Sequence, residues 1–169
     1  MKQFFINLRA RLQLRNNKQL RLSIPYQQIS SVGIIFSTED NQKHESIKSF
    51  VSQLELDSKK VTVLEFLHSK KENYESQYDF FSIDDFSFLG KNNSAVAQKF
   101  NETNFDYLIC LDCVTPHPAI LQLLAQSTAH CRIGKYWESN KLFFDFMIDN
   151  NGSVSKLTEQ INLYIRQLN

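Results

Sequence analysis

The sequence predicts an α/β fold, a three-layer Rossmann-like sandwich with a mostly parallel sheet and an appended N-terminal basic amphipathic helix. Short apolar runs alternate with segments of helical periodicity, which is typical of parallel strands joined by crossover helices. The chain has 169 residues, 42% hydrophobic and 22% charged, as expected for one globular domain. The first 22 residues contain six basic and no acidic residues. We therefore predict a basic helix at residues 1–22 and a single Rossmann-like domain at residues 23–169.

The first half of the chain contains the pattern of a strand–helix–strand unit. Residues 31–37 and 61–67 are short apolar runs, which indicates two buried strands. Between them, apolar side chains recur at i, i+3, i+4 and i+7, which indicates a helix: Ile47, Phe50, Val51 and Leu54. A crossover of this kind between parallel strands is nearly always right-handed.

The second half of the chain continues the alternation. Residues 79–83 are a candidate third strand, and residues 94–100 form a short helix after a turn. Residues 105–111 are the clearest strand, because they are apolar, rich in β-forming residues and bounded by polar ones. Pro118 suits the first turn of the helix that follows.

Two more strands and a helix complete the predicted sheet. Residues 131–134 form a brief strand, and the apolar run at residues 142–148 predicts another. The last helix is predicted from the spacing of four apolar residues: Val154, Leu157, Ile161 and Ile165.

A ligand site is expected where the order of the strands reverses. If the order is 3-2-1-4-5, this crevice lies between residues 31–37 and 105–111, beyond their carboxyl ends. The loops at residues 37–40 and 112–117 would line it. The predicted ligand-binding residues are Ser37, Thr38, Asp40, Asp112, Thr115 and His117.

The same crevice offers candidate catalytic residues, namely Glu39, Asp112 and His117. Two carboxylates and an imidazole in one site can act as acid and base, because they push each other's pKa values apart. The alternative is structural. Glu39 and Asp40 would then stabilise a helix N-terminus, and Asp112 would close a loop. The chain has no phosphate-binding loop or dinucleotide fingerprint and only 4 glycines, so no cofactor is expected.

Cys110, Cys113 and Cys131 are an odd number of cysteines without the spacing of a disulfide framework. This favours a reducing cytoplasm. Cys110 and Cys113 have the C-x-x-C spacing of some zinc sites. However, side chains three apart on a strand point to opposite faces, so we expect structural thiols and no metal site.

The basic N-terminal segment allows three interpretations. Its apolar residues Phe4, Phe5 and Leu8 could enter an anionic membrane, or a protein partner could bind Lys2, Arg9, Arg11 and Arg15. Alternatively, the apolar stripe packs on the domain and the charges stay in water. The net charge is only +1, so no nucleic acid is expected as a partner. No apolar stretch approaches the length of a transmembrane helix.

Two segments resemble known families. Residues 105–134 open with an aromatic–Asp pair and end with Arg-Ile-Gly, which resembles the N-terminal half of heptosyltransferase-type glycosyltransferases. These enzymes have a second, nucleotide-sugar-binding half and a glycine–acid turn after the first strand, and neither is expected in this chain. Residues 81–91 place an aspartate-rich segment before a Gly-Lys turn, and the whole chain resembles a small bacterial family without an established activity. The resemblances imply a fold, and no catalytic residue is carried over.

The residues favour a non-catalytic ligand-binding or protein-interaction domain of the cytoplasm, whose ligand is small and anionic. The first alternative is a small enzyme, a sugar- or nucleotide-handling transferase that uses Glu39, Asp112 and His117. The second is a membrane- or partner-docking protein that acts through its N-terminal basic helix.

Overall fold

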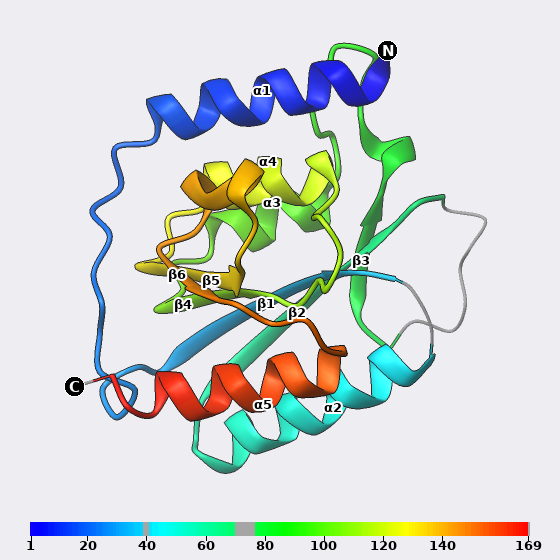
Figure 1. The fold of residues 1–169 in the computed structure, drawn as a ribbon. Coiled ribbons are helices and arrows are strands. Elements are labelled where there is room, and N and C mark those ends of the chain that lie inside the picture. The colour runs from blue at the N-terminus through cyan, green and yellow to red at the C-terminus, as the bar shows by residue number, and fades with distance from the viewer. Residues whose placement is uncertain (39–40, 70–76, 169) are drawn as a thin grey trace.

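A computed structural model describes residues 1–38, 41–69 and 77–168 (Figure 1). Within them, the strands are β1 (Ser31–Ser37), β2 (Lys60–Leu67), β3 (Asp79–Ser82), β4 (Tyr107–Cys110), β5 (Cys131–Lys135) and β6 (Phe146–Ile148). The helices are α1 (Lys2–Asn16), α2 (Asn41–Leu56), α3 (Ala95–Glu102), α4 (Pro118–Gln126) and α5 (Val154–Ile165). Two 3₁₀ helices, η2 (Ile83–Asp85) and η3 (Glu138–Phe143), complete the described elements.

The strands form one parallel sheet in the order β3-β2-β1-β4-β5-β6. This confirms the predicted α/β sandwich and extends the expected order of five strands by β6. The order reverses between β1 and β4, so the switch point lies where it was expected.

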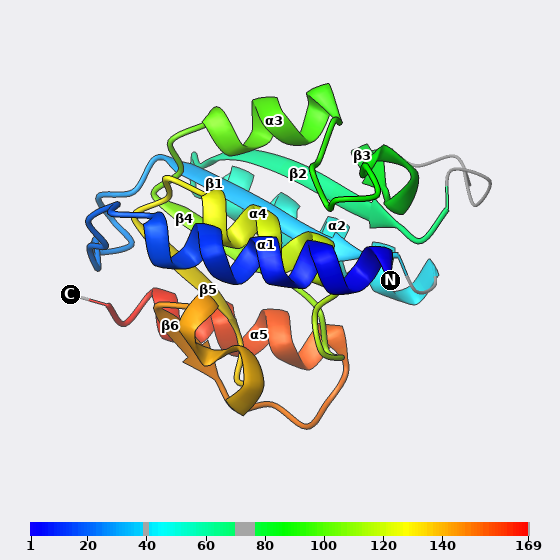
Figure 2. The same cartoon turned by 90° about the horizontal axis from the view of Figure 1, so that it is seen from above.

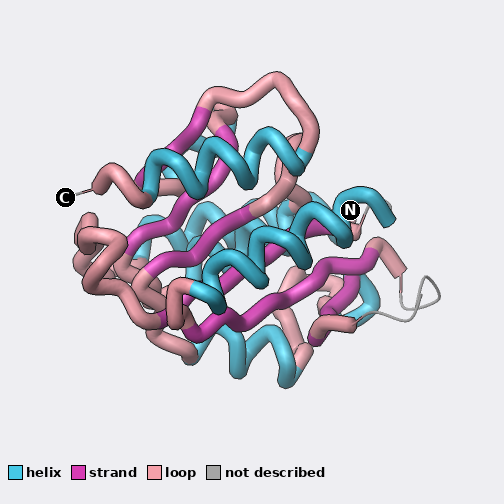
Figure 3. Tube along the Cα trace, turned by 90° about the horizontal axis from the view of Figure 1, so that it is seen from below, coloured by secondary structure: helices cyan, strands magenta, loops and turns pink. Residues whose placement is uncertain are grey.

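Helices cover both faces of the sheet. Figure 1 shows α3 and α4 on one face, and Figures 1 and 3 show α2 and α5 together on the other. Because side chains alternate along a strand, Ile35 packs on the α4 side while Ile34 and Phe36 pack on the α2 side. β1 is therefore buried on both faces, which explains why its sequence is an uninterrupted apolar run.

The helix α1 is shorter than predicted and packs by another face. It ends at Asn16 rather than at residue 22, and it lies along α4 (Figures 1 and 2). Ile6 and Ala10 are fully buried there, whereas the exposed side chains include Phe4, Leu8 and Leu12. Of the interpretations given for this segment, the one in which the stripe with Phe4 and Leu8 packs on the domain was therefore wrong. No helix among the described residues is long and apolar enough to span a bilayer.

The contact between α1 and the domain includes the turn around Gly90. A Cβ atom on Gly90 would lie 2.7 Å from the Ile6 nitrogen, so the two backbones touch. Gln122 of α4 fixes the same turn, because its side-chain amide donates to the Gly90 carbonyl oxygen at 2.9 Å. Residues 17–22 then run beside the turn between α4 and β5, where the Asn17 amide donates to the Ser127 carbonyl oxygen at 3.0 Å. The buried face of α1 is therefore the one that carries Ile6 and Ala10, and the bulky Phe4 lies on the outer face.

The predicted strand at residues 142–148 is divided. Its first residues belong to η3, and β6 begins at Phe146. Asp145 explains the division, because its carboxylate accepts hydrogen bonds from the Arg132 backbone N–H at 2.8 Å and from the Arg132 guanidinium at 2.9 Å. This bidentate pair places Asp145 beside β5 and starts the strand after it.

Candidate functional site

The carboxyl ends of β1 and β4 are joined by a buried carboxylate. Asp112, only 1% exposed, follows β4 and accepts hydrogen bonds from the Ser37 backbone N–H and hydroxyl, both at 2.8 Å. The Lys43 ammonium on α2, also buried, lies 2.8 Å from the same carboxylate. Both Asp112 oxygens accept hydrogen bonds from within the chain. These contacts join the start of the loop after β1 to the start of the loop after β4, at the base of the switch-point crevice.

A second buried carboxylate lies on the neighbouring strand. Glu65 of β2 is 1% exposed and accepts a hydrogen bond from the Thr38 hydroxyl. The His44 Nε2 atom on α2 is 2.8 Å from the same Glu65 oxygen. Thr38 is also held by its backbone N–H, which donates to the Phe66 carbonyl oxygen at 2.9 Å. The two carboxylates therefore hold the end of β1 from both sides, Asp112 through Ser37 and Glu65 through Thr38.

His117 caps α4 and packs in an aromatic cluster. Its Nδ1 atom accepts a hydrogen bond from the Ala119 backbone N–H at 3.2 Å. Its ring stacks on Phe66 at 4.6 Å between centroids, with the His68 ring edge-on at 5.7 Å. Burial, with a smaller contribution from His68 and against the opposing effect of Asp112, lowers the pKa of His117 to about 4. The imidazole is therefore neutral at physiological pH.

This depressed pKa makes the fold sensitive to acid. The unfolded chain binds a proton at His117 below about pH 6.5, whereas the folded chain does so only below about pH 4. The free energy of unfolding therefore decreases as the pH falls through this interval. We expect His117→Asn, which keeps a capping side chain, to reduce the loss of melting temperature between neutral pH and about pH 5. Above neutral pH the two melting profiles should run parallel. Equal losses on acidification would contradict the assignment.

The structure brings together four of the predicted site residues, namely Ser37, Thr38, Asp112 and His117. Thr115 is exposed on the loop after β4. Glu39 and Asp40 lie outside the described residues, so the predicted pairing of Glu39 with Asp112 stays a prediction. Asp112 has the bonds of a residue that closes a loop, which is the structural alternative given above.

Three polar residues of this cluster escaped the sequence analysis, namely Lys43, His44 and Glu65. One signal was available for Glu65, because it is the only charged residue in the apolar run at residues 61–67. Lys43 gave no signal, since a lysine in the first turns of a surface helix is normally in water.

The cysteines are packed as separate thiols. Cys110 belongs to the core on the α4 side of the sheet, whereas Cys113 packs on the α2 side. Burial raises the pKa of Cys110 well above its ordinary value and that of Cys131 to about 12, so both are protonated at neutral pH. In the described ranges, no group of three or more His, Cys, Asp or Glu side chains is arranged to hold a metal ion.

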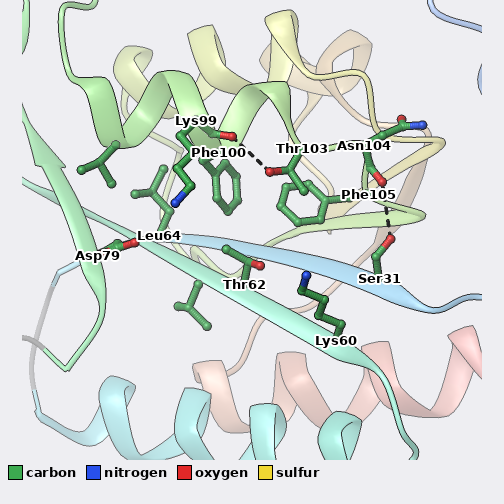
Figure 4. A pocket seen from close by; sticks show the side chains of 12 residues that line it. Ser31, Lys60, Thr62, Leu64, Asp79, Lys99, Phe100, Thr103, Asn104 and Phe105 are labelled. Atoms are coloured by element: carbon green, nitrogen blue, oxygen red, sulfur yellow. Dashed lines mark hydrogen bonds between the residues drawn. The ribbon is translucent and has the colours of Figure 1, made fainter.

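The opposite, amino-terminal end of the strands contains a space of ligand size. A cavity of about 490 Å³ lies between α3 and the amino-terminal halves of β1 and β2 (Figure 4). It exists because β3 pairs only with residues 64–67 of β2, which leaves the first half of that strand without a neighbour on this side. We call it the amino-edge cavity. Its polar lining residues are Ser31, Lys60, Thr62, Asp79, Lys99 and Thr103.

The charged groups of the amino-edge cavity approach from two walls. Figure 4 shows the Lys99 ammonium pointing from α3 toward the sheet and the Lys60 ammonium pointing from β2 toward the helix. The Thr62 hydroxyl lies between them in this view. At the carboxyl ends of the strands, one recess among the described residues, beside Lys43 and Cys113, holds about 150 Å³. The amino-edge cavity therefore combines a space of ligand size with cations on two of its walls.

Comparisons with known proteins agree with the resemblance of the whole chain. Neither a curated protein nor a solved structure matches it, and the likeness of residues 105–134 to heptosyltransferase-type enzymes is not confirmed. The model of a family described as "Family of unknown function (DUF6913)" matches residues 2–168. The match includes α1 together with the whole sheet. The chain therefore belongs to this family of unknown function.

Proposed function

We propose that the chain is a ligand-binding domain and that its ligand is a small phosphorylated or carboxylated molecule held in the amino-edge cavity. The observation that carries the proposal is the convergence of Lys60 and Lys99 on a space of about 490 Å³. Small-molecule sites typically occupy roughly 300–1,000 Å³. Two ammonium groups on opposite walls supply donors for an anion from both sides.

The remaining lining supports a ligand with both polar and apolar parts. Asp79 at one end adds a carboxylate, which suits a hydroxyl or amino group of the ligand. Leu64, Phe100 and Phe105 form a buried apolar base, which keeps water from competing with the polar contacts. A hydroxylated phosphate, such as a sugar phosphate, combines these properties.

The carboxyl edge supports binding over catalysis. A general acid or base must exchange a proton with its substrate, so it needs an atom within reach of that substrate. Asp112 is buried, and both its oxygens already accept hydrogen bonds from Ser37 and Lys43. The Nδ1 atom of His117 already accepts the N-cap hydrogen bond of α4. These contacts favour a supporting role for both residues over the transferase alternative.

Isothermal titration calorimetry of the full chain with inorganic phosphate and a panel of sugar phosphates tests the proposal. We expect Lys60→Gln/Lys99→Gln to weaken the binding of a responding ligand by at least about tenfold per lysine, because each charge-assisted contact contributes roughly 1.5–3 kcal/mol. The matched control is Lys18→Gln/Lys48→Gln, which removes two exposed lysines outside the cavity. Equal weakening in both variants would show that the effect comes from net charge, and it would contradict binding in the amino-edge cavity.

We further propose that the protein acts in a reducing compartment, the bacterial cytoplasm. Its three cysteines are all free thiols, which fits a compartment where disulfides are rare. The bacterial source is proposed from the sequence resemblance alone. Fractionation of the source cell, followed by detection of the chain in each fraction, tests the compartment.

A further inference from the structure

The outer face of α1 exposes a row of apolar side chains. Phe4, Leu8 and Leu12 are spaced four residues apart, so they lie along one face of the helix, and they are 66%, 46% and 49% exposed. The turn before Gly90 adds to the row. The Phe5 ring lies beside both the Phe4 ring and the exposed Phe88 ring, with 5.6 Å between centroids in each pair. We call this the α1 outer surface, formed by Met1, Phe4, Leu8, Leu12, Phe88 and Leu89, all exposed. Exposed apolar side chains gathered in this way favour an interaction site.

Arginines line the α1 outer surface on both sides. Arg11 and Arg15 each lie three residues after an apolar member of the row, Leu8 and Leu12, so they neighbour it on the helix. Arg9 lies on the other side, four residues after Phe5. The first acidic residue of the chain is at position 39, so α1 itself carries cations only.

We infer that the α1 outer surface binds the surface of an anionic phospholipid bilayer. Figures 1 and 2 show α1 as the outermost element on its side of the molecule, lying lengthwise over α4. Such a helix can rest in the plane of a bilayer interface, with Phe4, Leu8 and Leu12 among the upper acyl chains and the arginines at lipid phosphates. The chain then binds the membrane peripherally.

The charges of the chain favour a bilayer over a second copy. Two α1 outer surfaces brought together would place cations against cations, with no acidic residue of α1 to pair with them. Beyond residue 22 the chain holds 13 basic and 18 acidic residues, so an anionic surface attracts α1 and repels the rest. This asymmetry orients the molecule with α1 toward the lipid.

Vesicle co-sedimentation of the full chain tests the inference. At low ionic strength we expect the protein to pellet with vesicles that contain phosphatidylserine, and to stay in solution with vesicles of phosphatidylcholine alone. Arg11→Gln/Arg15→Gln should lower the partition coefficient roughly 30-fold, and Phe4→Ser/Leu8→Ser should abolish pelleting. The matched control is Leu142→Ser/Leu163→Ser, which changes two exposed leucines elsewhere and should pellet like the wild type. All substituted side chains are exposed, and unchanged urea midpoints verify that the variants fold.

Three results would overturn the inference. The first is a wild-type chain that stays in solution with both kinds of vesicle. The second is pelleting that survives Phe4→Ser/Leu8→Ser, because another surface would then hold the lipid. The third is tight binding to soluble poly-glutamate without any binding to vesicles, which would point to an acidic protein partner. None of these results bears on the amino-edge cavity, so this inference and the ligand proposal can fail separately.

Discussion

Asp112→Ala is expected to destabilise the fold by about 3–5 kcal/mol, the largest effect of any substitution considered for this chain. The substitution leaves the buried Lys43 ammonium without the counter-charge that lies 2.8 Å away in the native protein. It also removes the acceptor for the Ser37 backbone N–H and hydroxyl, which are buried as well. Urea denaturation followed by far-UV circular dichroism measures the change.

Two companion variants separate the charge from the hydrogen bonds. Ser37→Ala removes one neutral donor and should cost about 1 kcal/mol. Lys43→Met/Asp112→Leu removes both charges and should recover most of the stability, because well-packed apolar residues often replace a buried ion pair without loss. A cost below about 1 kcal/mol for Asp112→Ala would show that this contact does not hold the carboxyl edge together.

Gly90→Ala is expected to cost roughly 2–4 kcal/mol and to loosen α1. Gly90 has a φ of +76°, a conformation that alanine adopts only with strain. The new Cβ atom would also lie 2.7 Å from the Ile6 nitrogen and 2.8 Å from the Phe5 carbonyl carbon, both of which are backbone atoms. The turn and α1 must then separate. Urea denaturation gives the cost, and tryptic cleavage at Arg9 and Arg11 reports the release of the helix.

Gly152→Ala is the matched control for this substitution. Its new Cβ atom would meet Lys156 Cδ at 2.6 Å, and that atom belongs to a flexible side chain that can move away. We expect a cost below about 1 kcal/mol and no change in cleavage at Arg9. If Gly90→Ala behaved like this control, α1 would be an appendage rather than part of the packed domain.

Strong periodicity made most elements of the sheet predictable. The apolar run at residues 31–37 coincides with β1, and the spacing from Val154 to Ile165 coincides with α5. Periodicity could not choose the buried face of α1, because apolar residues occur on two of its faces. The buried face depends on packing against α4 and on the backbone contact with Gly90, both distant in sequence. The break before β6 depends in the same way on a long-range pair, Arg132 with Asp145.

The candidate sites were predictable only in part. Ser37 and Asp112 were expected in one crevice because both follow strands that flank the switch point, and their side chains do meet. The amino-edge cavity gave no sequence signal. Lys60 and Lys99 come from separate elements, and the space between them exists only because β3 is short. A space between elements that are distant in sequence cannot be predicted from any local pattern of residues.

Titration of the isotope-labelled chain with inorganic phosphate and a sugar phosphate, followed by the amide signals in NMR spectra, tests the central claim most directly. The account predicts saturable shifts at Lys60, Thr62, Lys99 and Thr103 around the amino-edge cavity, with little change at Ser37. Shifts confined to Ser37, Lys43 and Ser153 would place the anion at the carboxyl edge and contradict the account. An absence of shifts with every ligand tested would contradict it equally.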